Sequence, residues 1–430
     1  MENLSAWEDA GWGNNSTANL RTPSVAIISD ERFPHYATNT QQVVKNADAL
    51  AAAGLPSDLI IPVQWKGLFQ PGYDVADAIS RYYNVPRRTS IKKIFTIPAS
   101  NLRIEKFTHC IAALIYAFIR KYDVIYTRNE FTAIMSALLG KKTVFETYRK
   151  FGDEYPRFMR WLSKYARKPA FLGMILHSRL SFDSMLRAGF PAEKLAIFHN
   201  GFDYADMQPM LTKTEAREKL GWEKGQRHVV YTGNMQVNKG IESVIDIARK
   251  MPAVKFVLVG GTQFDTNRLQ NYAEQNAVSN VTFTGFKAIK EVSCYLYAAD
   301  VLIIPPASAP LEKYGRTVLP FKTFLYLAAG RPVLAPLQPD LTEVLEDGYN
   351  ALLVEPDNLD AAVAALESLF ANPAMHLRIS ENAAASVSDL TWDARAKKII
   401  HWLTNAFHGN HPVIEQQEKQ ALAKTAVTAV

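Results

Sequence analysis

Two series of short apolar runs, each run followed by a helical segment, constrain the fold of this chain more than any other feature. The first series lies at residues 24–30, 59–62, 122–127, 142–146, 173–177 and 195–198. The second lies at residues 229–232, 255–260, 281–283, 301–304, 333–335 and 351–354. Continuous apolar runs of this length are typical of strands that are buried on both faces. Their alternation with helices predicts an α/β fold with two parallel, doubly wound sheets.

The polar stretch at residues 200–214, which contains Pro209, separates the two series. Two such sheets in one chain are expected to form two lobes, and ligands bind in the cleft between lobes. We therefore expect five parts along the chain: 1–22 (irregular or disordered), 23–206 (first Rossmann-like lobe), 207–390 (second Rossmann-like lobe), 391–407 (an amphipathic helix) and 408–430 (a tail, frayed or loosely helical).

The composition is that of a soluble globular protein: the 430 residues are 48% hydrophobic and 21% charged. Cys110 and Cys294 follow no metal or redox spacing, so we expect them to stay reduced in a cytoplasm. The first residues lack the basic start and apolar core of a signal peptide. The longest apolar run, residues 110–119, has about half the length of a membrane span, so we expect no membrane crossing.

Two segments concentrate the positive charge. One contains Arg87, Arg88, Lys92, Lys93, Arg103 and Lys106. The other contains Lys150, Arg157, Arg160, Lys164, Arg167 and Lys168, interleaved with Phe158, Met159, Trp161, Leu162, Tyr165 and Phe171. This pattern suits a peripheral contact with anionic lipid head groups at the inner face of a membrane, and it equally suits a solvated basic face above a core-facing stripe. No recognised nucleic-acid-binding motif accompanies the charge, so nucleic acid is not expected as a partner.

The stretch VVYTGNMQVNKG, residues 229–240, has the outline of a phosphate site. A β-branched run ends at Gly233, a polar loop carries Lys239, and helical periodicity begins at Ile241. A strand that turns into a helix in this way presents backbone N–H groups at the carboxyl edge of a sheet, where anions bind. The alternative is that Lys239 is a solvated turn residue, since lysines are mostly exposed.

The blocks that follow in the second half resemble one family. GNMQVNKGIESVIDIA, FVLVGG, VTFTGF, AADVLIIPP, LYLAAGRPVLAP and LTEVLEDGYNALLVEPDN occur in order over roughly 130 residues. They resemble the carboxyl lobe of the group 1, or glycogen synthase-like, retaining glycosyltransferases, which have the GT-B architecture of two Rossmann-like lobes. The block around Lys322 is similar to the branch of that family that reads like SPLKLFEYMAAG. Weaker similarity, including IYTRN and AGFPAEKLAIFHNGFD, extends the resemblance over residues 24–405.

The resemblance implies transfer of a sugar from a UDP- or GDP-sugar to an acceptor hydroxyl with retention of configuration, and no cofactor is expected. No metal is expected either, because the sequence has no Asp-x-Asp pair in a strand-end loop and lysines can neutralise the diphosphate. The acceptor would be a glycan, a lipid-linked glycan or a similar molecule bound by the first lobe, and the donor would bind the second lobe. It also implies that the helix at 391–407 crosses back to the first lobe, with a hinge near residues 203–209. Such a reaction depends on cations and N–H groups that stabilise the departing diphosphate.

The resemblance assigns site residues by position. Residues with an expected catalytic role are Lys239, Lys322, Tyr148 and Glu146. Residues expected to bind the donor are Gly233, Asn234, Lys239, Gly285, Phe286, Arg316, Thr317, Leu319, Pro320, Phe321 and Lys322. Residues expected to face the acceptor or the cleft are Thr38, Asn39, Thr40 and Arg128. The loop that opens the helix at 323–329 would supply a second diphosphate cradle.

The chain also departs from the family pattern. Asn234 replaces an arginine, Thr317 and Leu325 replace two glutamates, and Tyr148 replaces a sugar-binding histidine while Glu146 is retained. Arg316 would restore positive charge. The departures motivate a second hypothesis, a catalytically inactive scaffold or regulatory subunit, beside the leading hypothesis of an active transferase. A GT-B epimerase or another sugar-nucleotide enzyme is disfavoured because no carboxylate pair is found.

Several residues keep two interpretations. Glu343 either touches the sugar or caps a helix. His199 is expected to be a turn or hinge residue rather than a base. Arg128 either reaches a phosphate or acceptor, or forms a salt bridge within the first lobe.

Overall fold

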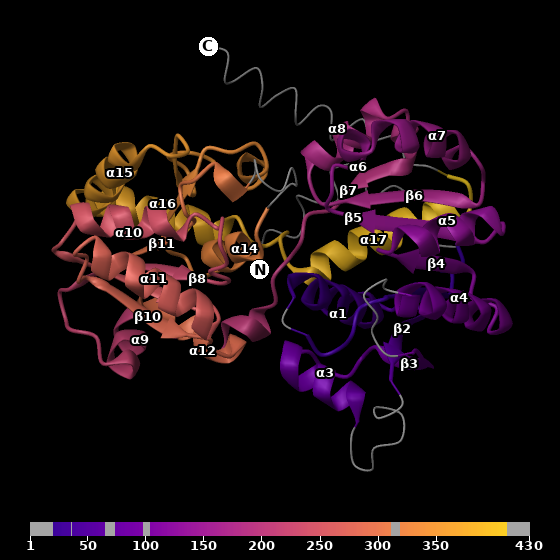
Figure 1. Ribbon diagram of the computed structural model, residues 1–430, viewed down its shortest axis with the longest axis horizontal. Helices are drawn as coiled ribbons and strands as arrows, with labels where there is room; N and C mark the ends of the chain where they lie inside the picture. The colour runs from indigo at the N-terminus through magenta and orange to yellow at the C-terminus, as the bar shows by residue number, and fades with distance from the viewer. Residues whose placement is uncertain (1–19, 36, 65–73, 98–103, 311–318, 411–430) are drawn as a thin grey trace.

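The computed structural model describes residues 20–35, 37–64, 74–97, 104–310 and 319–410. Within these ranges the chain forms two α/β lobes that lie side by side, each built around one sheet (Figure 1). The predicted fold class, two doubly wound lobes with parallel sheets, is confirmed. The predicted tail, apart from residues 408–410, and most of the predicted amino-terminal segment lie outside the described residues.

The amino lobe contains the first strand–helix series. Its elements are β1 (Val25–Ile28), α1 (Thr38–Ala52), β2 (Ser57–Val63), α3 (Val75–Tyr83), β3 (Ser90–Phe95), α4 (Ile104–Ile119), β4 (Val124–Thr127), α5 (Glu130–Leu138), β5 (Lys142–Thr147), α6 (Phe151–Glu154), α7 (Pro156–Ala166), β6 (Phe171–Leu176), α8 (Arg179–Arg187), η3 (Ala192–Lys194) and β7 (Leu195–Ile197). The strand order is β3-β2-β1-β4-β5-β6-β7.

The carboxyl lobe follows the short turn η4 (Tyr204–Met207). Its elements are α9 (Lys213–Leu220), β8 (Arg227–Thr232), α10 (Ile241–Lys250), β9 (Val254–Val259), α11 (Gln263–Gln275), β10 (Val281–Gly285), α12 (Ile289–Ala298), β11 (Val301–Ile303), α14 (Phe321–Ala328), β12 (Val333–Pro336), η5 (Leu341–Glu343), β13 (Leu352–Val354), α15 (Leu359–Ala371) and α16 (Pro373–Ala385). The strand order is β10-β9-β8-β11-β12-β13.

Each sheet reverses its winding direction at its first strand. The chain places β2 on one side of β1 and β4 on the other, and in the carboxyl lobe it places β9 and β11 on the two sides of β8. Open α/β sheets bind ligands outside the carboxyl ends of the strands at such a switch point. The fold therefore predicts one site after β1 and β4 and another after β8 and β11.

Two elements differ from the sequence prediction. Strand β3 was not predicted, because Lys92 and Lys93 interrupt its apolar pattern. It pairs only with β2 among the described strands, and lysines at a sheet edge discourage further strand pairing. Helix α1 begins at Thr38, so the polar loop expected at residues 38–40 is its first turn.

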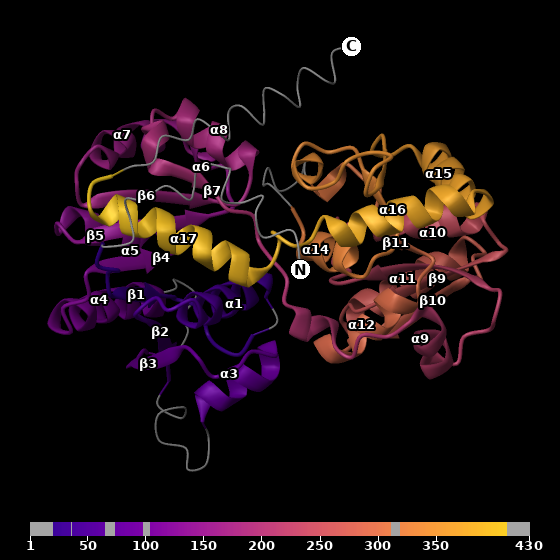
Figure 2. The same cartoon turned by 180° about the vertical axis from the view of Figure 1, so that it is seen from behind.

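Helix α17 (Trp392–Phe407) leaves the carboxyl lobe and lies across the amino lobe (Figure 2). Ile399, Trp402 and Leu403 are buried in the core formed with strands β1, β2, β4 and β6. A Cβ on Gly173 of β6 would lie 2.8 Å from the Trp402 ring, so the bare backbone at this position lets the tryptophan approach the sheet.

The two connections between the lobes run side by side. The N–H of Phe202 donates to the carbonyl of Leu390 at 3.0 Å, and the N–H of Trp392 donates to the carbonyl of Phe202 at 3.1 Å. A Cβ on Gly201 would stand 2.6 Å from the backbone nitrogen of Trp392. The absence of a side chain at Gly201 is therefore what allows the connections to pair.

Candidate active site

Glycines line the carboxyl edge of the second sheet at its switch point. The N–H of Gly233 donates to the carbonyl of Val259 at 2.8 Å, and the N–H of Gly260 donates to the carbonyl of Gly285 at 2.9 Å. A Cβ on Gly260 would lie 2.3 Å from the carbonyl oxygen of Gly233. Only glycine at position 260 lets these loops pack so closely, and Gly233 itself remains exposed.

Two lysines stand beside this edge. The ammonium of Lys322 lies 3.5 Å from the centre of the Tyr231 ring and 3.0 Å from the position that a Cβ on Gly233 would take. Burial lowers the pKa of Lys322 well below its usual 10.5, and the positive charge of Lys239 lowers it further. Two ammonium groups that repel each other at a glycine-lined strand edge form a site that an anion would stabilise.

The first turn of α14 adds N–H groups to the same region. Pro320 occupies the N-cap position and provides no side-chain cap. The first N–H groups of a helix have no partner within the helix, and they favour a negative charge. Phe321, the first residue of α14, packs with the Trp392 ring at a centroid distance of 5.8 Å. Because Trp392 starts α17, Lys322 is fixed at the junction of the two lobes.

The other expected donor residues occupy different environments. The ring of Phe286 is 72% exposed after β10, next to Gly285, so it is open to stack on a base. Leu319 is buried in the core, so only its backbone is available to a ligand. The Asn234 side chain accepts a hydrogen bond from the N–H of Gln236 at 2.9 Å and thus serves the turn. Arg316 and Thr317 lie outside the described residues.

The amino lobe has a polar cavity of about 650 Å³ at its own switch point. Its walls include the segments after β1 (28–31) and β4 (126–131), together with residues 146–149 after β5. Asn39, Glu146, Tyr148 and Arg128 therefore line one cavity.

Glu146 lies in this cavity wall, but its carboxylate is fully engaged. It accepts hydrogen bonds from the hydroxyl of Tyr126, from Nε2 of His177 at 2.6 Å and from the guanidinium of Arg395 at 2.9 Å. Burial alone would raise the pKa of Glu146, yet Arg395 and the other donors hold it well below the usual value. The carboxylate is therefore a fixed negative charge that anchors helix α17, and it is a poor candidate for a proton-accepting base.

Tyr148 and Arg128 face each other in the same cavity. The guanidinium of Arg128 lies 5.7 Å from the centre of the Tyr148 ring, and its Nη1 donates to Gln42 at 2.5 Å. The Nη2 atom is buried without a hydrogen-bond partner among the described residues. The salt bridge considered for Arg128 is replaced by this contact with the neutral Gln42, which leaves one N–H-bearing nitrogen for a ligand.

The three residues expected in a cleft loop diverge because they form the first turn of α1. Thr38 is exposed and Asn39 lines the cavity. Thr40 is buried, and its hydroxyl donates to the carbonyl of Ala37 at 2.7 Å. The expectation that all three face the cleft is wrong for Thr40, since a helix turns successive side chains to different sides.

Glu343 makes a helix-cap contact, and the helix that it caps belongs to the other lobe. Both carboxylate oxygens accept from the N–H of Arg179, the first residue of α8, at 2.8 Å. The same carboxylate accepts from Nε2 of His199 at 2.8 Å. His199 thus acts at the lobe junction, as a hinge residue would, and Glu343 joins the two lobes.

Sequence reasoning missed the partners of Glu146. Tyr126, His177 and Arg395 come from β4, the end of β6 and α17, and each is almost fully buried. Burial lowers the pKa of His177 to about 4, so the ring is neutral at pH 7. The available signal was the arginine within the amphipathic helix at 391–407, because a buried arginine needs a carboxylate partner.

Comparison with known proteins gives a family match over part of the chain and a fold. Residues 212–386 match the family model described as glycosyl transferases group 1. Alpha-D-kanosaminyltransferase of Streptomyces kanamyceticus is 22% identical over 267 residues, which are 58% of this chain and 67% of that protein. Alpha-monoglucosyldiacylglycerol synthase of Streptococcus pneumoniae is 25% identical over 277 residues, which are 59% of this chain and 60% of that protein.

Solved structures show the same arrangement of two lobes. Anabaena HepE in complex with UDP superimposes with a TM-score of 0.68 at 17% identity and covers 89% of this chain and 100% of its own. Sucrose-phosphate synthase from Thermosynechococcus elongatus superimposes with a TM-score of 0.70 at 18% identity, and the match covers 90% of this chain and 100% of that protein.

Proposed function

We propose that this chain, whose residues 212–386 match the group 1 glycosyltransferase family model and whose fold is that of solved GT-B glycosyltransferases, transfers a sugar from a nucleotide-diphosphate sugar to an acceptor hydroxyl with retention of configuration. The donor is a UDP- or GDP-sugar, and the product belongs to polysaccharide or glycoconjugate biosynthesis. Neighbouring structures that hold UDP or UDP-glucose support the choice of donor class.

The pair Lys239 and Lys322 carries the proposal. Burial and the charge of Lys239 both disfavour the charged form of Lys322, and no carboxylate contributes to its environment among the described residues. A diphosphate between the two ammonium groups would reverse this penalty. In the transfer, negative charge grows on the departing diphosphate, and a preorganised donor at such a position is worth roughly 100- to 1,000-fold in rate.

The remaining donor contacts follow from the same edge of the sheet. The bare backbone at Gly233 would leave room for the phosphates, the first turn of α14 would offer them backbone N–H groups, and Phe286 would stack on the base. The transferred sugar would lie towards the amino-lobe cavity, where Tyr148 replaces the family's histidine and Arg128 has a nitrogen without a partner. Glu146 anchors α17 beside this wall through its ion pair with Arg395.

The test is donor turnover. The purified protein is incubated with UDP- and GDP-sugars, and release of the nucleoside diphosphate to water or to added acceptors is measured. We expect turnover of one donor and loss of at least about 100-fold in Lys239→Ala. Lys250→Ala, which removes an exposed lysine of the same lobe, serves as the control and should turn over at the wild-type rate. Equal turnover by Lys239→Ala would overturn the assignment.

One observation keeps a second function in view, a catalytically inactive scaffold or regulatory subunit. Leu325, at the position of the family's ribose-binding glutamate, packs against the core of the carboxyl lobe, and Asn234 is used by its own turn. This alternative predicts that no nucleotide binds and that a protein partner co-purifies with the chain.

A further inference from the structure

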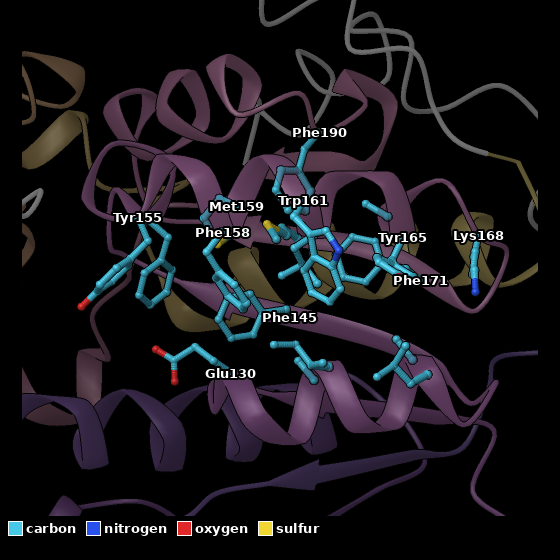
Figure 3. A pocket seen from close by; sticks show the side chains of 18 of the residues that line it. Glu130, Phe145, Tyr155, Phe158, Met159, Trp161, Tyr165, Lys168, Phe171 and Phe190 are labelled. Carbon is cyan, nitrogen blue, oxygen red and sulfur yellow. The ribbon is translucent and has the colours of Figure 1, made fainter.

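A groove between α5 and α7 on the amino lobe is lined mainly by apolar side chains. Its volume is about 300 Å³. Figure 3 shows Phe158, Trp161 and Tyr165 in a row along α7, with Glu130 and Tyr155 towards one end and Lys168 at the other. The opposite wall is formed by small and aliphatic side chains of α5, which are Ala133, Ile134, Ala137 and Leu138.

The groove demands an apolar ligand. None of its lining residues carries a buried polar atom that lacks a hydrogen-bond partner within the described ranges. Trp161 is 46% exposed and Leu138 is 52% exposed, so large apolar surfaces face water in the groove. A ligand in the groove would bury these surfaces. Exposed apolar patches of this kind mark binding sites.

Exposed apolar side chains continue from the groove onto α4, which packs beside α5. They are Phe107, Ile111, Ile115, Phe118 and Ile119 on α4, and Leu139 after α5. The structure describes no helix long and apolar enough to span a bilayer. An apolar surface made by these side chains, on helices that are too short or too polar to span a bilayer, fits the interfacial layer of a membrane.

Positive charge flanks the groove on the side away from the core. Arg157, Arg160, Lys164, Arg167 and Lys168 are exposed, and none of them forms an ion pair with a described residue. The spacing of Arg157, Arg160 and Lys164 places them on one face of α7, next to the aromatic row. The other basic segment differs, because Arg87 pairs with Asp74 and Lys106 pairs with Asp30. The basic side chains of α7 and of the two residues that follow it therefore complement anionic head groups.

The groove also opens towards the polar cavity. Glu130, Arg149 and Phe151 line both spaces. Arg149 lies 3.7 Å from Glu130 and 4.3 Å from the centre of the Phe151 ring, so a charged pair marks the change from apolar to polar walls. An amphiphilic molecule fits this change from apolar to polar walls, with its hydrocarbon chain in the groove and its polar end towards the cavity.

We propose that the groove between α5 and α7 binds one hydrocarbon chain of an anionic membrane lipid. The cations of α7 hold the lipid head groups at the bilayer surface, and the exposed side chains of α4 enter the interface. The site fixes the amino lobe on the membrane with its polar cavity next to the head-group layer. This inference is independent of the donor site, which lies in the other lobe.

Quenching of tryptophan fluorescence by brominated lipid tests whether the hydrocarbon chain of the lipid lies in the groove. The probe is a vesicle of phosphatidylglycerol with dibromostearoyl chains, and the reference is the same vesicle without bromine. We expect bromine to quench part of the tryptophan emission in the wild type, because Trp161 lines the groove. The bromine-dependent part should vanish in Trp161→Phe, which keeps an aromatic ring at that position. Equal quenching in both proteins, or none in the wild type, would overturn the proposal.

A matched pair of substitutions tests the groove as the cause of membrane binding. Leu138→Glu places a carboxylate in the groove, whereas Leu377→Glu makes the same change at a 58% exposed leucine on α16 of the carboxyl lobe. We expect Leu138→Glu to lower co-sedimentation affinity for phosphatidylglycerol vesicles by about tenfold or more, and Leu377→Glu to leave it unchanged. Equal affinities would show that the groove holds something else, such as a helix of a partner protein.

Nucleotide binding separates failure of this site from failure of the proposed function. Stabilisation by UDP or GDP should be the same in Leu138→Glu and in the wild type, which also confirms that the variant folds. Loss of lipid quenching with intact nucleotide binding would reject the lipid site alone. Lipid quenching without any nucleotide binding would support the lipid site and reject the transferase proposal.

Discussion

Glu343 of the carboxyl lobe lies 2.8 Å from Nε2 of His199 in the amino lobe and also accepts from the N–H of Arg179. One carboxylate therefore holds a hinge residue and the start of α8 at the same time. This contact is made only when the lobes sit as described, and it identifies a specific point at which their separation is controlled.

Removing the Glu343 carboxylate should destabilise this arrangement. Hydrogen bonds to a charged group contribute about 1.5–3 kcal/mol each, and the partly exposed position lowers that figure. We expect Glu343→Ala to lower the unfolding free energy by about 1–2 kcal/mol in urea titrations and to increase the radius of gyration in X-ray scattering. Glu346→Ala, an exposed neighbour, is the control. Identical scattering curves for the Glu343→Ala variant and the wild type would contradict a role in lobe spacing.

The paired connections between the lobes predict an effect at Gly201. A Cβ there would lie 2.6 Å from backbone atoms of Thr391 and Trp392, which cannot move aside without separating the connections. We expect Gly201→Ala to cost about 1–3 kcal/mol in urea unfolding. Gly54→Ala adds a Cβ in open space at a positive φ and tests strain alone. The prediction fails if Gly201→Ala unfolds at the same urea concentration as the wild type.

Acid should weaken the amino lobe through His177. Its pKa is about 4 in the folded protein, against 6.5 for an unperturbed histidine, because burial disfavours the charged ring. As the pH falls below 6.5, the unfolded chain binds the proton first, so stability is fully present above 6.5 and is lost down to pH 4. The difference between these two pKa values corresponds to about 3 kcal/mol of unfolding free energy.

The measurement is urea unfolding of the wild type and His177→Gln at pH 7 and pH 4. Asp48 acts in the opposite sense, because burial raises its pKa to about 6, but it is present in both proteins and cancels in the comparison. The wild type should lose about 3 kcal/mol more than the variant between the two pH values. Equal losses would show that His177 is charged, or able to charge, in the folded state.

Binding of a diphosphate should be accompanied by uptake of a proton by Lys322. The pKa of Lys322 is well below 10.5 without a ligand because of burial and Lys239, and a bound diphosphate favours the charged form. Affinity should therefore be highest at low pH and fall as the pH rises through the ligand-free pKa of Lys322. Calorimetry of UDP or GDP binding in buffers with different ionisation enthalpies measures the uptake, which should disappear in Lys322→Met. Buffer-independent enthalpies would contradict the assignment.

Much of the fold could be predicted because strands buried on both faces leave an unbroken apolar run. Residues 24–30 and 229–232 are examples, and both mark central strands of their sheets. The edge strand β3 could not be found this way, since its lysines face solvent and carry no periodic apolar signal. The first turn of α1 was missed because no capping side chain marks its start at Ala37.

Part of the candidate site could likewise be predicted from the sequence, and part could not. Lys239 is readable from the sequence because the strand, turn and helix that hold it are consecutive. The group around Glu146 is not, because Tyr126, His177 and Arg395 meet only after the lobe folds and α17 returns to it. No local pattern links residues so far apart in the chain. The domain boundaries and the roles of the site residues stay predictions.

The most direct test of the central claim is a thermal-shift screen of the purified protein with UDP, GDP, ADP, TDP and CMP. It is repeated on Lys239→Ala and Lys322→Ala, with Lys250→Ala as the control. We predict that UDP or GDP stabilises the wild type and the control, by about 2.7 kcal/mol at a ligand concentration one hundred times the Kd, and that both site variants lose this stabilisation. Flat melting curves with every nucleotide, or unchanged stabilisation of both site variants, would contradict a donor diphosphate between Lys239 and Lys322.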